Sequence, residues 1–174
     1  MNSTAGGLKV ATGVQITTVT EAGRDADAVR DLFLEYGESL GFNTCFMGLD
    51  EELISLPGDY APPRGCLLLA KDKGETAGCV GLRPLSNATC EMKRLFVRAG
   101  YRGAGLGRRL AEAAIERARA MGYRRVVLDT LPNMLEARAL YRSLGFNPCA
   151  PYYDNSCLGS DCFELELGPT TAGQ

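Results

Sequence analysis

Residues 101–110 read Tyr-Arg-Gly-Ala-Gly-Leu-Gly-Arg-Arg-Leu, a composition that suits the binding of a phosphate group. Glycine has no Cβ and adopts positive φ at little cost, so three alternating glycines let the backbone turn sharply and approach a ligand closely. A helix that begins near Gly105 would add unpaired backbone N–H groups and the positive end of its dipole. The stretch therefore predicts a cradle for a phosphate or a pyrophosphate.

Two common phosphate-binding loops do not fit these residues. A Walker A loop ends in Gly-Lys-Ser/Thr, whereas Gly107 is followed by two arginines. A dinucleotide fingerprint requires a third glycine where this chain has Arg108. The remaining pattern, Arg102, Gly105 and Gly107 in the spacing Arg-x-x-Gly-x-Gly, resembles the acetyl-CoA pyrophosphate loop of the GNAT N-acetyltransferase superfamily. An ordinary glycine-rich turn between a strand and a helix is the structural alternative.

A second stretch, residues 128–146, carries the more specific part of the resemblance. GNAT proteins commonly have a strand followed by a helix that reads Asn-x-x-Ala-x-x-Leu-Tyr-x-x-x-Gly-Phe. Met134 stands where the family usually has Asn, with Asn133 one residue earlier. Because both motifs occur in this order, the chain is identified as a member of the GNAT superfamily, and the resemblance covers residues 14–168. The positions that match in register are Ala137, Leu140, Tyr141, Gly145 and Phe146.

The resemblance implies where acetyl-CoA would bind. The family holds it where two neighbouring parallel strands splay apart, here one ending near Val97 and the other near Asp129. The backbone of residues 95–97 would pair with the pantetheine arm as an added strand does, and residues 102–108 would take the pyrophosphate. The expected cofactor-binding residues are Leu95, Phe96, Val97, Arg102, Gly103, Ala104, Gly105, Leu106, Gly107, Arg108, Asn133, Ala137 and Tyr141.

Acetyl transfer to an amine requires a neutral amine, stabilisation of an oxyanion and a proton for the leaving thiolate. The chain has no histidine, so carboxylates and tyrosines must handle the protons. Tyr141 is the expected acid, because the tyrosine of the family motif usually lies near the CoA sulfur; core packing is the alternative. Glu91 is the expected base, because it precedes Arg102 by eleven positions, as does a glutamate of the histone-acetylating branch; a solvent-facing strand residue is the alternative. A backbone N–H near Phe96 or Val97 would bind the oxyanion.

Composition narrows the class of protein. A formal charge of −2 over 174 residues gives no basic field, so neither nucleic acid nor an anionic membrane is expected as a partner. Seven cysteines without Cys-x-x-Cys spacing, in a chain lacking histidine, make zinc and other metal sites unexpected and suit a reducing compartment. No apolar run is long enough for a membrane span, and residues 1–13 lack the features of a secretory signal. A cytoplasmic location is therefore expected.

Hydrophobic periodicity and turn residues predict an α/β fold with a mixed, mostly antiparallel central sheet and flanking helices. We expect a leader at residues 1–13, one GNAT domain at 14–168 and a tail at 169–174. Helices are expected over 24–40, 49–56, a segment beginning near Gly105, and a segment after Pro132. Strands are expected over 14–19, 65–71, 76–82, 89–97, 125–129 and 162–167.

The sequence thus predicts an acetyl-CoA-dependent N-acetyltransferase that acts by direct transfer to an amine. A non-catalytic acyl-CoA-binding or regulatory module of the same fold is the main alternative, and a nucleotide-binding module is another. The sequence leaves the acceptor open between small molecules and protein amines. It also leaves open an acyl group other than acetyl and a homodimeric state.

Overall fold

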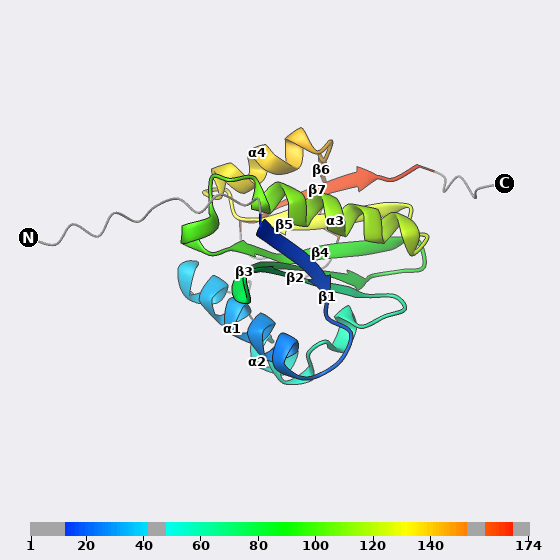
Figure 1. Ribbon diagram of the computed structural model, residues 1–174. Helices are drawn as coiled ribbons and strands as arrows, with labels where there is room; N and C mark the ends of the chain where they lie inside the picture. Colours follow the sequence, from blue (N-terminus) through cyan, green and yellow to red (C-terminus); the bar gives the residue numbers. More distant parts are fainter. Residues whose placement is uncertain (1–12, 42–47, 153–158, 169–174) are drawn as a thin grey trace, which may run out of the picture.

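The computed structural model describes residues 13–41, 48–152 and 159–168. Residues 1–12 of the expected leader and all of the expected tail lie outside these ranges. The elements, in chain order (Figure 1), are β1 (Val14–Thr18), α1 (Arg24–Ser39), α2 (Leu49–Ser55), η3 (Gly58–Tyr60), β2 (Cys66–Asp72), β3 (Glu75–Pro84), β4 (Thr89–Val97), η4 (Ala99–Tyr101), α3 (Leu106–Ala120), β5 (Arg125–Thr130), α4 (Leu135–Ser143), β6 (Asn147–Cys149) and β7 (Asp161–Glu166).

A seven-stranded sheet of order β1-β2-β3-β4-β5-β7-β6 forms the centre of the described chain. Strands β1 to β4 form an antiparallel meander, β4 and β5 pair in parallel, and β7 pairs antiparallel with both β5 and β6. The fold class expected from the sequence is confirmed. The short strand β6 was not expected, because three residues that include a proline carry no periodic signal.

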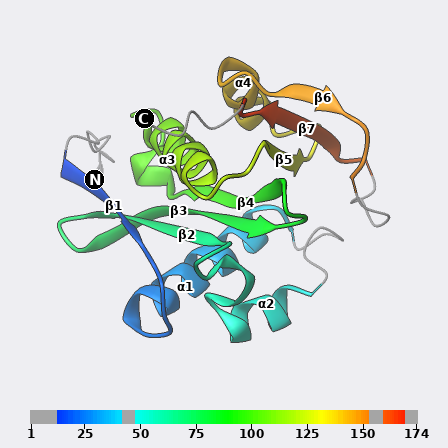
Figure 2. The same cartoon turned by 90° about the vertical axis from the view of Figure 1, so that its right-hand side faces the viewer.

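Helices cover both faces of the sheet, with α3 on one face and α1 with α2 on the other (Figures 1 and 2). On the α3 side, Leu106, Leu110 and Ala114 pack against alternate side chains of the central strands. On the other side, Val29, Leu32 and Phe33 of α1 do the same. These stripes recur at helical spacing, and burying them is the main force that holds the helices to the sheet. Among the helices of the described residues, none has the length and apolarity needed to cross a bilayer.

Strands β4 and β5 pair only over their first residues, from Thr89 with Arg125 to Glu91 with Val127. Strand β4 continues to Val97, so its second half has no partner on the β5 side within the described register. Unpaired N–H and C=O groups at a strand edge are a template for an extended ligand. The structure therefore contains the opening between parallel strands that the family resemblance implies.

A β-bulge lies in β4 at the point where this opening begins. Cys79 of β3 pairs with Phe96, whereas Gly81 pairs with Lys93, so two residues of β4 lie opposite one residue of β3. Arg94 has a φ of 58°, a left-handed conformation that is uncommon for a residue with a side chain. The bulge changes the alternation of the strand, and Lys93 and Arg94 both line the same cavity as a result.

Candidate active site

A large pocket of about 770 Å³ lies between the end of β4, the start of α3 and α4. We call it the outer pocket. Of the expected cofactor-binding residues, all except Ala104 line it, while Ala104 packs against the core on the α3 side. The structure thus brings residues of two separate motifs, within 101–110 and 128–146, to one cavity. The expected residues in the lining are Leu95, Phe96, Val97, Arg102, Gly103, Gly105, Leu106, Gly107, Arg108, Asn133, Ala137 and Tyr141.

The glycine stretch has the backbone of an anion cradle. Gly103 and Gly105 have φ of 77° and 80°, and Gly105 is the N-cap of α3. The first helical bond runs from the N–H of Arg109 to the carbonyl of Gly105, at 3.1 Å. The amides of residues 106–108 precede that bond and have no acceptor within the helix. They therefore face the outer pocket with the positive end of the helix dipole.

We expect Gly105→Val to weaken acetyl-CoA binding by at least about tenfold, because the new side chain strains the positive φ and projects over the cradle. Gly122→Val is the matched control. Gly122 has a φ of 83°, and an added Cβ there likewise meets nothing within 4 Å, but it lies at the other end of α3. Titration calorimetry on both folded variants checks the prediction. Unchanged affinity in Gly105→Val would remove the glycine stretch from the cofactor site.

The two arginines of the cradle have partners from the protein itself. The Nε of Arg102 donates to the carbonyl of Val97 at 2.8 Å, and its guanidinium lies 5.7 Å from the ring centre of Phe96. Arg108 donates to the hydroxyl of Ser143. Both side chains line the outer pocket, so a phosphate would compete with these contacts. A donor of a ligand at this edge of β4 would share the Val97 carbonyl with Arg102, because a carbonyl oxygen can accept two hydrogen bonds.

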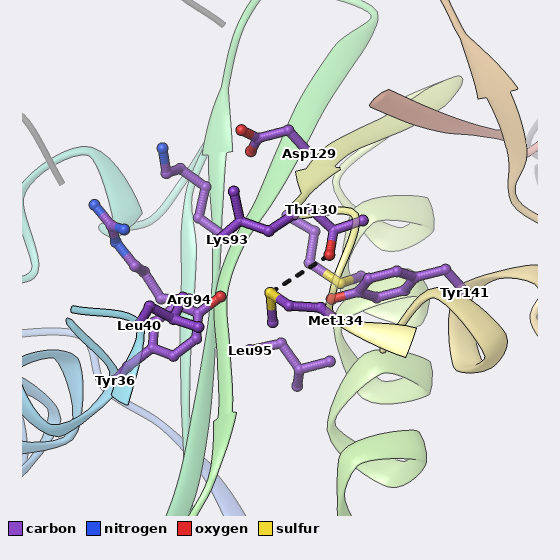
Figure 3. Close-up of a pocket in the computed structure, with 11 residues that line it drawn as sticks. Tyr36, Leu40, Lys93, Arg94, Leu95, Asp129, Thr130, Met134 and Tyr141 are labelled. Atoms are coloured by element: carbon purple, nitrogen blue, oxygen red, sulfur yellow. Dashed lines mark hydrogen bonds between the residues drawn. The ribbon is translucent and has the colours of Figure 1, made fainter. Parts of the chain in front are cut away.

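A smaller pocket, of about 60 Å³, lies where β4 and β5 stop pairing (Figure 3). We call it the inner pocket. It shares part of its lining with the outer pocket, namely Tyr36, Leu40, Leu95, Met134 and Tyr141, so the two cavities adjoin. The rest of its lining is Met92, Lys93, Arg94, Asp129, Thr130 and Leu131.

Tyr141 lies at the junction of the two pockets. Its ring packs edge-on against Phe146, with centroids 5.7 Å apart, and its side chain points to the centre of the inner pocket in Figure 3. Burial raises its pKa well above the usual value, with smaller contributions from Tyr36 and Asp129. The phenol is therefore protonated at neutral pH and can donate a proton or a hydrogen bond.

Glu91 lies beside the inner pocket and is not among the residues that line either cavity. Its side chain is 0% exposed. Arg83 donates two hydrogen bonds to its Oε2, at 3.0 and 3.1 Å, and the Nζ of Lys93 lies 3.4 Å from its Oε1. The alternative of a solvent-facing strand residue is wrong, because the Glu91 side chain is fully buried. Its role as a base stays a prediction.

Comparison with known proteins gives three findings. The family model described as Acetyltransferase (GNAT) family matches residues 26–146. An uncharacterized N-acetyltransferase of Schizosaccharomyces pombe is 41% identical over 146 residues, which cover 83% of this chain and 90% of the relative. A crystal structure of an acetyltransferase from Streptococcus agalactiae has a TM-score of 0.77 at 21% identity, covering 89% of this chain and 99% of that one.

The chain belongs to the acetyltransferase (GNAT) family. The predicted family and enzyme class are therefore confirmed. The structure of yncA from Salmonella typhimurium contains its cofactor acetyl-CoA. This structure matches the present chain with a TM-score of 0.65 at 20% identity, and the match covers 94% of this chain and 99% of that one.

Sequence reasoning missed three polar residues of this acetyltransferase's inner pocket. Tyr36 comes from α1, far from both motifs, and burial raises its pKa to about 12, opposed by Arg94. Lys93 reaches the pocket next to the β4 bulge, and Asp129 lies near the end of β5. A polar residue at the carboxyl end of a buried parallel strand is the signal that could have identified Asp129.

Proposed function

We propose that this GNAT acetyltransferase transfers an acetyl group from acetyl-CoA directly to the amine of an acceptor. The observation that carries the proposal is the junction of the two pockets at Tyr141. A cofactor held by the glycine cradle would extend along the outer pocket and present its thioester at this junction. An acceptor amine would approach from the inner pocket.

The fit of this cofactor rests on the cradle and on the free edge of β4. The N–H of Arg98 donates to Ala77 of β3, and successive residues of a strand direct their backbone groups to opposite sides. The N–H groups of Leu95 and Val97 therefore point into the opening, where pantetheine would pair. Of the two amides expected to bind the oxyanion, that of Val97 has the suitable direction and that of Phe96 does not.

The reaction forms a bond between the amine nitrogen and the acetyl carbon and breaks the bond from that carbon to sulfur. One proton leaves the amine, and one proton reaches the thiolate of CoA. Tyr141 is the proposed donor to the thiolate, because its phenol is protonated and lies at the junction. Asp129 is the proposed acceptor of the amine proton, since this residue lines the inner pocket directly.

The cytoplasmic location and the homodimer stay predictions.

The proposal is tested first by binding and then by turnover. Acetyl-CoA at a hundred times its Kd should raise the free energy of unfolding by about 2.7 kcal/mol, whereas ATP and NAD at equal concentration should not. Free CoA should then appear when acceptor amines are added. Binding of acetyl-CoA without CoA release from any acceptor would favour the non-catalytic module, and stabilisation by ATP or NAD alone would favour a nucleotide-binding module.

A further inference from the structure

The inner pocket has a basic wall on β4 and an acidic wall on β5. Lys93 and Arg94 line it from β4, and Asp129 lines it from β5. Lys93 and Asp129 each lie two residues beyond the last pair between these strands, Glu91 with Val127. Alternation of side chains along the strands puts both on the same face of the sheet, and Figure 3 shows them on the same side of the pocket.

The ion pairs that involve Lys93 and Arg94 form a cluster with one more positive than negative charge among the described residues. Arg94 binds Glu52 through two hydrogen bonds, of 2.8 and 3.2 Å. Arg83 and Lys93 share one carboxylate, that of Glu91. This ion-pair cluster therefore contains three cations and two carboxylates, and two of the cations, Lys93 and Arg94, line the pocket.

Lys93 is the cation with the weakest compensation in this group. Its Nζ lies 3.4 Å from Oε1 of Glu91, and that oxygen accepts no hydrogen bond within the described part of the chain. The Lys93 side chain is only 15% exposed, so water compensates its charge poorly. A lysine ammonium has three N–H donors, and an anionic group of a ligand in the inner pocket would accept from them.

We propose that the acceptor is a small free amino acid, that is, an amine with a carboxylate a few bonds away. This assignment rests on the proposed function. The carboxylate of the acceptor would accept hydrogen bonds from Lys93, and its amine would lie between Asp129 and the junction with the outer pocket at Tyr141. A cavity of about 60 Å³ suits a small molecule.

The same charges disfavour acceptors that carry a second cation. A polyamine would place an ammonium group beside Lys93 and Arg94, where like charges in a poorly hydrated pocket repel. An amino acid amide or a decarboxylated amine would avoid that repulsion but would offer Lys93 no anionic group in the ligand. These kinds of acceptor can therefore be separated by rate.

The test compares each amino acid of a panel with its own amide and its decarboxylated amine, together with spermidine, by release of free CoA. Rates are expressed per concentration of neutral amine, because amides have a lower amine pKa than free acids. We expect kcat/KM for the best amino acid to exceed that for its amide by about tenfold or more, the size of one charge-assisted hydrogen bond. Lys93→Met should reduce this ratio toward one, and Lys93→Gln provides a second, polar variant if the first does not fold.

Lys73→Met is the matched control, since Lys73 is exposed in the turn between β2 and β3 and should leave the ratio unchanged. Equal or faster turnover of the amide, the decarboxylated amine or spermidine in the wild-type enzyme would overturn the amino acid assignment and leave the proposed function intact. An unchanged ratio in both folded Lys93 variants would also overturn it. Absence of CoA release from every acceptor, in a protein that binds acetyl-CoA, would instead overturn the proposed function.

Discussion

Replacing Tyr141 with phenylalanine is expected to lower kcat by about 10²–10⁴-fold while leaving folding and acetyl-CoA affinity nearly unchanged. The substitution keeps the ring that packs against Phe146 and removes only the hydroxyl. If that hydroxyl protonates the leaving thiolate, its loss raises the barrier by about 3–5 kcal/mol, which exceeds the effect of one lost hydrogen bond. Because burial raises the pKa of Tyr141 well above its usual value, ionisation of this phenol should not limit the wild-type rate near pH 10.

Two further tyrosines make this experiment specific. Tyr123 is buried and donates to the carbonyl of Arg64 at 2.7 Å, outside both pockets, so Tyr123→Phe removes a buried hydroxyl without reaching the reaction. Tyr36 lines both pockets and offers a second phenol at the junction. We expect kcat to fall strongly in Tyr141→Phe alone. A full-rate Tyr141→Phe enzyme beside a slow Tyr36→Phe enzyme would transfer the acid to Tyr36.

The glycine cradle could be predicted because its signal is local. Gly103, Gly105 and the helix that follows lie close together in the sequence, and glycine permits the positive φ that both positions adopt. The helix motif around Tyr141 has the same property, since a 3.6-residue period fixes which side chains share a face. The tertiary structure then places both motifs in the lining of the outer pocket.

The inner pocket could not be predicted in the same way, because its residues meet through tertiary pairing. Lys93 and Arg94 line one cavity because β4 has a bulge opposite β3. The pairing register of two strands cannot be predicted from the sequence of either strand alone. Tyr36 lies on α1, more than fifty residues before the start of β4, and periodicity does not predict a contact across that separation. The sequence around Glu91 does not separate a solvent-facing side chain from a buried one, and its full burial against Arg83 and Lys93 follows from tertiary packing.

The burial of Glu91 leads to a prediction about stability. Glu91→Gln should lower the free energy of unfolding by about 3 kcal/mol, because it leaves Arg83 and Lys93 without the carboxylate they share. The lower end of the usual range is expected, since about a third of the Arg83 side chain remains exposed to water. Urea unfolding of the free protein, followed by circular dichroism, measures the change.

Glu164→Gln is the matched control for this loss of a paired charge. Glu164 pairs with Arg125 at 3.1 Å, but both side chains are about a third or more exposed, and such pairs contribute less than about 1 kcal/mol.

The pH dependence of kcat/KM for Glu91→Gln separates two roles of Glu91, a catalytic base and a charge that holds Arg83 and Lys93. A base would make the loss of rate largest below the pKa of the amine, in addition to the loss of stability. A charge that only holds Arg83 and Lys93 would instead change the rate by a similar factor at every pH, and the complete burial of Glu91 favours this second result.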